Sequence, residues 1–81
     1  MRLAWDGKAL KELQKLDSLI QRRIIKCVEE LELNPSAKDV RKLKGIDGFR
    51  LRVGDYRIIF HIDKDIIFIS KVGHRKGIYK R

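Results

Sequence analysis

The chain has 81 residues, and 20 Lys and Arg against 11 Asp and Glu give it a formal net charge of +9. We expect a single domain over residues 1–81, because one domain usually takes about 100–200 residues. Its one cysteine, Cys27, excludes an internal disulfide and a zinc ribbon. No apolar run approaches a membrane span of about 18 residues or a signal peptide, so we expect a cytoplasmic protein.

The first 35 residues predict a strand followed by two helices. Apolar residues alternate along residues 1–5, which is the period of a short strand. Asp6 can cap a first helix, and Ser18 with Gln21 three residues later resembles the capping box of a second helix. The Asn-Pro pair at 34–35 ends the second helix. Because the connection between them is short, we expect the helices to form an antiparallel hairpin over a sheet.

A polar, basic loop is expected from Ser36 to Asp47, and a β-hairpin follows it. Between Phe49 and Ile62 the only turn signal is Gly54-Asp55, which suits a two-residue type II′ turn. This register places Val53 opposite Tyr56 and separates an apolar face from a basic face. The basic face carries Arg50, Arg52, Arg57, Ile59 and His61. A three-residue loop would bury arginines among apolar residues, and we reject it.

The segment 66–72 is apolar on both faces, which predicts a central strand whose register the sequence leaves open. Residues 73–77 then form a loop, and Ile78 and Tyr79 a short extended piece. The predicted fold is α+β, in the order strand, helix, helix, strand, strand, strand. An antiparallel sheet carries the helical hairpin on one face and the basic side chains on the other.

The positive charge is concentrated in the second half of the chain. Residues 1–40 contain 8 basic and 7 acidic residues, whereas residues 41–81 contain 12 basic and 4 acidic residues. Such an excess suits nucleic acid. Binding to a lipid surface would require a basic amphipathic helix, but this half of the chain predicts strands.

Three arginines cluster on the basic face of the predicted hairpin. Arg52 lies directly opposite Arg57, and Arg50 lies diagonally close, an arrangement that disfavours folding. Anionic oxygens would relieve the repulsion, and guanidinium groups match the geometry of phosphate. A solvated outer face would account for a single arginine. It accounts poorly for three clustered arginines on a face that carries no acidic residue. We therefore interpret the cluster as a phosphate-binding surface.

The sequence lacks the clustered carboxylates that two-metal nuclease chemistry needs, so we expect neither a metal ion nor another cofactor. RNA can be cleaved without metal, because its own 2′-hydroxyl is the nucleophile. The protein must then supply a base, an acid and positive charge for the transition state. His74, Arg75 and Tyr79 follow the last strand and are candidates for these roles.

Two motifs identify a family. The run Arg50 to Phe60, with its Gly-Asp-Tyr-Arg turn, and the Val-Gly-His-Arg segment at 72–75 with Tyr79 resemble the RelE family of the RelE/ParE toxin superfamily. The resemblance extends over essentially the whole chain. It implies a toxin that cleaves mRNA in the A site of the ribosome and that a RelB-type antitoxin neutralises.

The resemblance also implies roles for single residues. Arg57 resembles the phosphate-stabilising arginine of the family, Arg75 the arginine at the leaving group, and Tyr79 the proposed base. Arg50 and Arg52 occupy the positions of two basic residues that hold substrate. The spacing from Arg75 to Tyr79 is short for the family, so His74 remains an alternative base. The further basic residues that we expect to contact nucleic acid are Lys44, Lys71, Lys76, Lys80 and Arg81.

Two other functions remain open from the sequence alone. The ParE branch of the superfamily inhibits DNA gyrase with a similar fold, although its members typically read His-Gly-x-Arg where this chain reads Gly-His-Arg at 73–75. A basic RNA-binding module without catalysis is the third possibility. Codon-positioned cuts in translated mRNA distinguish the nuclease from both.

Overall fold

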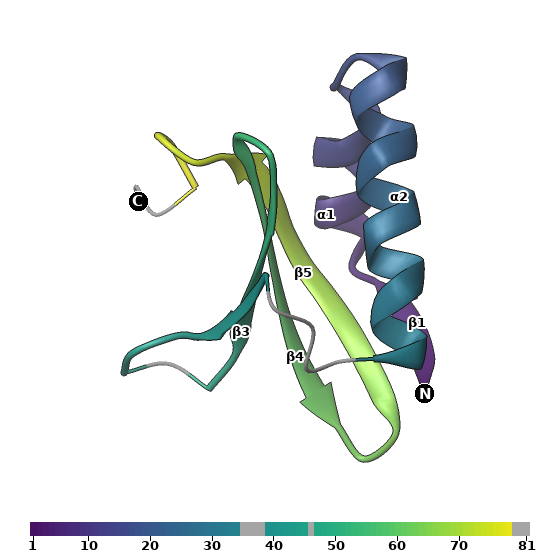
Figure 1. Cartoon of the computed structure of the whole chain (residues 1–81), viewed down its shortest axis with the longest axis vertical. Helices are drawn as coiled ribbons and strands as arrows, with labels where there is room; N and C mark the ends of the chain where they lie inside the picture. The colour runs from purple at the N-terminus through teal and green to yellow at the C-terminus, as the bar shows by residue number, and fades with distance from the viewer. Residues whose placement is uncertain (35–38, 46, 79–81) are drawn as a thin grey trace.

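The computed structural model describes residues 1–34, 39–45 and 47–78 as a five-stranded sheet with two helices on one side (Figure 1). The elements in chain order are β1 (Arg2–Trp5), α1 (Gly7–Gln14), α2 (Ser18–Leu33), β2 (Val40–Lys42), β3 (Phe49–Val53), β4 (Tyr56–Asp63) and β5 (Ile66–His74). The strand order in the sheet is β1-β5-β4-β3-β2. The predicted α+β class is confirmed, and the expected elements occur in the predicted order with one additional strand, β2. β5 lies between β1 and β4, so it is an interior strand as predicted.

The sheet is mixed, which corrects the expected antiparallel sheet. β2, β3, β4 and β5 pair antiparallel with their neighbours, whereas β1 pairs parallel with β5, with Arg2 opposite Ile66 and Trp5 opposite Ile69. The two helices between β1 and the rest of the sheet bring the chain back for this parallel pairing.

The predicted cap of the first helix is confirmed, and the predicted cap of the second is wrong. The Asp6 carboxylate accepts from Lys8 N, but α2 is capped by Asp17, whose carboxylate accepts from Leu19 N at 3.1 Å. Ser18 is already the first helical residue. The Gln21 side chain instead donates to Leu16 O at 2.7 Å, so it satisfies a carbonyl in the connection between the helices.

The core lies between the helices and one face of the sheet. α1 packs on β5, and α2 packs against β1 and β3. The buried residues of this core are Ala9, Leu13, Ile24, Val28, Leu31, Leu51, Val53, Ile58, Phe60, Ile67, Ile69 and Val72. Phe60 is a large, fully buried side chain of this core and stacks on Phe49 with ring centroids 5.4 Å apart. One face of the sheet is thereby covered, and the other remains for the basic side chains.

The β3–β4 hairpin has the predicted register. Val53 pairs with Tyr56 and Arg52 with Arg57, so Gly54 and Asp55 alone form the loop. Gly54 has a φ of +58° and Asp55 has no positive φ, as a type II′ turn requires. The three-residue alternative is thus excluded, and Arg50, Arg52 and Arg57 share the face opposite the helices.

The expected loop at 36–47 contains a strand. Val40–Lys42 forms β2, which pairs with β3 at the edge of the sheet and sets Arg41 directly opposite Arg50. The Arg52 N–H donates to Asp39 O at 3.0 Å just before the strand begins. A run of one valine and two basic residues is too short to show a strand pattern of its own, and pairing with β3 imposes the conformation.

β5 contains a bulge and extends beyond its predicted end. The register shifts between Ile59 and Phe60 of β4, which pair with Lys71 and Ile69, so Ser70 is the extra residue. Its hydroxyl donates to Ile59 O at 3.1 Å. Gly73 and His74, expected in a loop, belong to the strand, and Ile78 lies in a turn rather than an extended piece. Tyr79 lies outside the described residues.

Candidate phosphate-binding site

The sheet face opposite the helices carries a basic surface, which we call the arginine face: Arg41, Arg50, Arg52, Arg57 and Lys71. The strand register arranges these residues in two cross-strand rows. Arg41, Arg50, Ile59 and Lys71 form one row, and Arg52, Arg57 and Gly73 form the other. Two pairs of like charges therefore stand directly opposite one another, an arrangement that destabilises a sheet. Arg41 joins the cluster only because of β2, and so the sequence did not indicate it.

Arg57 is held in place by the turn that precedes it. The Arg57 side chain is half-buried, and its Nη1 donates to Gly54 O at 2.9 Å and to Tyr56 O at 3.0 Å. Within the described part of the chain it has no acidic partner. These two carbonyl contacts orient a guanidinium whose charge remains uncompensated, so it is available to an anion.

Arg75, which follows β5 near the C-terminal end of the chain, lies beside the Gly54-Asp55 turn. Its N–H donates to Asp55 O at 2.8 Å, and its Nε lies 3.7 Å from Asp55 Oδ1. Both side chains of this ion pair are largely exposed, so the pair itself stabilises little. The backbone hydrogen bond fixes the turn after β5 beside the hairpin tip and places Arg75 near Arg57.

Arg52 and Arg50 differ in their pairing. Arg52 Nη2 lies 3.2 Å from Asp39 Oδ1, whereas the buried Nε of Arg50 has no hydrogen-bond partner among the described residues. Burying an N–H without an acceptor costs about 1–3 kcal/mol. Arg50 is therefore unfavourable for folding both in its burial and in its pairing with Arg41.

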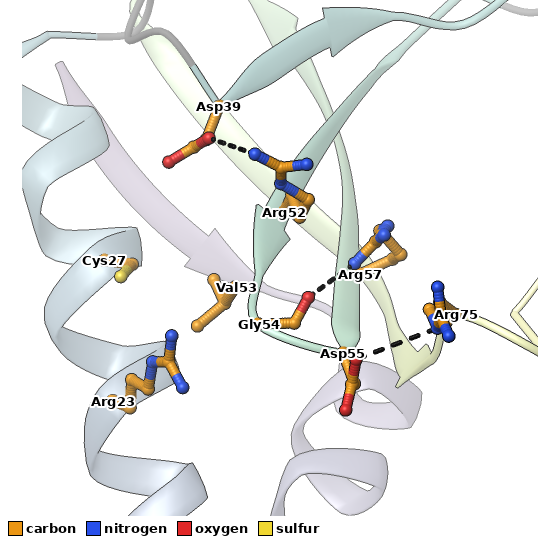
Figure 2. Close-up of a pocket in the computed structure, with 9 residues that line it drawn as sticks. All are labelled: Arg23, Cys27, Asp39, Arg52, Val53, Gly54, Asp55, Arg57 and Arg75. Carbon is orange, nitrogen blue, oxygen red and sulfur yellow. Dashed lines mark hydrogen bonds and ion pairs between the residues drawn. The ribbon is translucent and has the colours of Figure 1, made fainter.

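A hollow of about 520 Å³ opens at the hairpin tip. Figure 2 shows Arg23 and Cys27 on α2 at one side of it and Arg52, Arg57 and Arg75 at the other, with Val53 and Gly54 of the hairpin between them. Asp39, Val53, Gly54 and Asp55 complete its lining. Sequence reasoning missed Arg23, because a charged residue on an exposed helix flank carries no signal. Burial raises the pKa of the Cys27 thiol, Glu30 adds to the shift, and Arg23 opposes it.

The other candidate residues lie apart from this hollow. His74 pairs with Tyr56, so it lies on the helix-facing side of the sheet, and its ring meets Tyr56 edge-on at 5.5 Å. Its Nδ1 accepts from Lys76 N at 3.2 Å. Lys44 lies in the β2–β3 connection, at the end of β3 opposite the Gly54 turn. Tyr79, Lys80 and Arg81 lie outside the described residues.

Among the described residues, no group of three or more His, Cys, Asp or Glu side chains could hold a metal ion. No helix in the described ranges is long and apolar enough to cross a membrane. The arginine face and the hollow offer the chemistry of clustered guanidinium groups, which bind and stabilise oxyanions.

Comparison with known proteins places this geometry in a family. A sequence profile described as ParE toxin of the type II toxin-antitoxin system parDE matches residues 3–79. Toxin RelE3 of Methanocaldococcus jannaschii is 34% identical, over 98% of this chain and 96% of that protein. This chain is a RelE family toxin. The family resemblance drawn from the Gly-Asp-Tyr-Arg turn and the Val-Gly-His-Arg segment is thus confirmed.

Two further relatives of the toxin agree with this assignment. The mRNA interferase toxin RelE of Escherichia coli K12 is 30% identical, over 91% of this chain and 82% of that protein. The crystal structure of the archaeal RelE-RelB complex from Pyrococcus horikoshii OT3 matches with a TM-score of 0.82 and 32% identity, covering 94% of this chain and 96% of that one. The RelE fold therefore extends over nearly the whole toxin.

Proposed function

We propose that this toxin is an endoribonuclease that cuts mRNA in the ribosomal A site without a metal ion and so inhibits translation in the cytoplasm. The observation that carries the proposal is the hollow at the hairpin tip, where Arg52, Arg57 and Arg75 meet. The printed name of the E. coli relative, an mRNA interferase, supports the same activity.

In the proposed reaction, the 2′-hydroxyl oxygen of RNA bonds to the adjacent phosphorus while the bond from phosphorus to the 5′-oxygen breaks. The products are a 2′,3′-cyclic phosphate and a 5′-hydroxyl. Arg57 is assigned to the pentavalent transition state, because its guanidinium is already oriented by two carbonyl oxygens. Arg75 is assigned to the leaving 5′-oxygen as the acid. Arg50 and Arg52 hold the neighbouring backbone.

A base must take the proton of the 2′-hydroxyl, and His74 and Tyr79 are the two candidates. His74 lies on the helix-facing side of the sheet, away from the arginine face, and its Nδ1 is occupied by Lys76 N. We therefore assign the base to Tyr79. A pH–rate profile of Tyr79→Phe beside His74→Ala tests the choice, since the rise in rate with pH reports deprotonation of the general base, and loss of this rise in the histidine variant alone would reverse the assignment.

The ribosome is proposed as the place of cleavage because the toxin offers little base readout. Guanidinium contacts to phosphate position a strand but carry no sequence information. Binding in the A site would supply the orientation that the small arginine face lacks, an effect that can reach several kcal/mol. Rapid, sequence-specific digestion of free RNA would contradict this part of the proposal.

A RelB-type antitoxin is the proposed partner. The solved relative from Pyrococcus horikoshii is a RelE-RelB complex, and its RelE fold covers nearly the whole of this chain. An acidic antitoxin segment would complement the arginine face. Complex formation that weakens steeply with added salt is expected.

The family profile carries the ParE description, and this favours gyrase inhibition as a second candidate. Primer extension on translated mRNA separates the two. We expect codon-positioned cuts with the wild-type toxin, a loss of about a hundredfold or more in Arg57→Ala, and no loss in Arg22→Ala, an exposed arginine of α2. Growth arrest with uncut message and a supercoiling defect would support the gyrase reading instead. RNA binding without cuts would leave the non-catalytic module.

A further inference from the structure

The hollow at the hairpin tip has a second wall, which α2 provides. Arg23 and Cys27 are four residues apart on this helix, so they lie on one side of it, and both line the hollow. The opposite wall carries Arg52, Arg57 and Arg75 (Figure 2). The proposed cleavage chemistry uses only that opposite wall, and Arg23 has no role in it.

Arg23 lies against the backbone of the turn. A Cβ atom built on Gly54 would be 3.0 Å from Arg23 Nη1 and 3.3 Å from its Cζ, so the guanidinium lies close against the turn and would have to shift by a few tenths of an ångström for any side chain at this position. The carbonyl of the same Gly54 accepts from Arg57 Nη1 at 2.9 Å. Two guanidinium groups thus flank one glycine, one on the helix side and one on the side of the arginine face.

The two acids of the hollow do not neutralise these two arginines. Asp39 pairs with Arg52, and Asp55 pairs with Arg75. In the ranges that the structure describes, neither Arg23 nor Arg57 has an ion-pair partner. Four arginines and two aspartates therefore leave the hollow with an excess of positive charge, located on the two groups that flank Gly54.

We propose that Arg23 forms a second phosphate subsite, which binds the RNA phosphodiester next to the one that is cleaved. The inference rests on the proposed nuclease function and extends it. A strand whose scissile phosphate contacts Arg57 passes over Gly54, and its neighbouring phosphate meets the Arg23 guanidinium. The subsite holds the strand by charge and fork geometry and takes no part in proton transfer.

The test measures binding and cleavage separately. Ribosomes programmed with an mRNA that carries a 2′-deoxy nucleotide at the cut site bind the toxin without being cleaved. We expect Arg23→Ala to bind about five- to tenfold more weakly and to lower the salt dependence by about one phosphate contact. Arg23→Lys should lie between it and the wild type. Arg22→Ala removes the same charge from the neighbouring exposed position and should change neither quantity.

Cleavable mRNA gives the second readout. Arg23→Ala should raise KM by the same factor as the dissociation constant and leave kcat within about twofold, because the contact is the same in the ground state and the transition state. An mRNA with an uncharged methylphosphonate beside the cut site should lose the same affinity for the wild type and lose nothing further for Arg23→Ala. Thermal melting should be unchanged, since Arg23 is exposed.

Several results would overturn the subsite. Arg23→Ala could match Arg22→Ala in affinity, its defect could fall on kcat alone, or the methylphosphonate loss could be additive with it. A loss confined to antitoxin binding would assign the hollow to a carboxylate of that partner. If the wild type binds the 2′-deoxy complex in an Arg23-dependent manner but leaves cleavable mRNA intact, the nuclease proposal fails and the phosphate subsite stands. If the wild type neither binds the 2′-deoxy complex nor cleaves mRNA, the nuclease proposal and the phosphate subsite both fail.

Discussion

Ile78 closes over Gly73 so tightly that a Cβ atom on Gly73 would lie 2.8 Å from Ile78 Cδ1. Ile78 is buried, and its N–H donates to His74 O at 2.9 Å. The turn that follows β5 is therefore folded back on the end of that strand. Because Arg75 lies within this turn, the contact between Gly73 and Ile78 helps to hold Arg75 beside the hairpin tip.

Gly73→Ala is expected to force Ile78 outward. The overpacking should destabilise the protein by about 1–3 kcal/mol and, by displacing Arg75, reduce mRNA cleavage. Denaturant unfolding and primer extension measure the two effects. Gly77→Ala is the matched control, because a Cβ atom there would meet nothing within 4 Å.

The double variant makes this prediction specific. Ile78→Val removes the Cδ1 atom that the new methyl group would meet, so Gly73→Ala with Ile78→Val should recover part of the stability and the cleavage that Gly73→Ala alone loses. Strictly additive losses would show that the two residues do not interact in this way.

Glu12 of α1 closes the edge of the sheet where β1 has ended. β1 pairs with β5 only as far as Trp5 opposite Ile69, and Asp6 N donates to Ile69 O. Beyond this point the Val72 N–H has no strand to pair with, and Glu12 Oε1 accepts from it at 3.1 Å. Glu12→Ala leaves this N–H unpaired and should cost about 1–3 kcal/mol of unfolding free energy.

Glu12→Gln keeps an acceptor oxygen and loses only the charge, so its loss of stability should be clearly smaller. Hydrogen exchange gives the local readout, since protection of the Val72 amide should fall in Glu12→Ala more than protection of Ile69. Equal losses in both variants would assign the effect to the charge of Glu12 rather than to the hydrogen bond.

The sequence predicted the arginine face because charge and apolarity separate only in one register of the hairpin. The two-residue loop sets Arg52 opposite Arg57, whereas a three-residue loop would place arginines on the same face as the apolar side chains of β4. The same reasoning failed for β5, because Ile69 and Val72 share the core face only through the bulge at Ser70. An apolar run on both faces cannot indicate where an extra residue will be inserted.

Other features depended on tertiary contacts that no local pattern encodes. Arg41 belongs to the arginine face because β2 pairs with β3, and three residues are too short to predict as a strand. Arg23 reaches the hollow only through the packing of α2 beside Gly54. Asp17 and Ser18 are both good caps, and the sequence could not decide between adjacent residues of this kind.

The rate at which the Cys27 thiol is alkylated is a probe of its surroundings in the hollow. Burial raises the pKa of its thiol above the ordinary 9.0, so at a given pH less reactive thiolate is present than in the unfolded chain. We expect slower alkylation by iodoacetamide near pH 8 in the native protein than in denaturant. Arg23 opposes the shift, so Arg23→Ala should raise the pKa further and slow alkylation more. Arg22→Ala is the control.

The raised pKa of Cys27 also makes the stability of the fold depend on pH. A thiol whose pKa is higher in the folded state favours folding through its protonated form. That contribution is fully present below the unfolded pKa and is lost as the pH rises from the unfolded pKa through the higher folded pKa. Native alkylation with the same pH midpoint as the unfolded chain would contradict the effect of burial.

Arg50 is expected to oppose stability and serve function. Its buried Nε has no hydrogen-bond partner among the described residues, and Arg41 stands directly opposite it. Met can occupy much of the same space without the charge, so Arg50→Met should raise the unfolding free energy by about 1 kcal/mol while lowering mRNA cleavage. Denaturant unfolding measures the first effect and primer extension the second. Arg22→Met, on an exposed helix position, should do neither.

The salt dependence of unfolding distinguishes the two causes of the stability gain expected for Arg50→Met. Repulsion between Arg50 and Arg41 is screened at high ionic strength, whereas the cost of a buried N–H without an acceptor is not. The advantage of Arg50→Met should therefore shrink between 0.1 M and 1 M salt but not vanish. A variant that loses stability together with cleavage would mean that Arg50 is needed for packing, because its long aliphatic stem then contributes more than its unpaired charge costs.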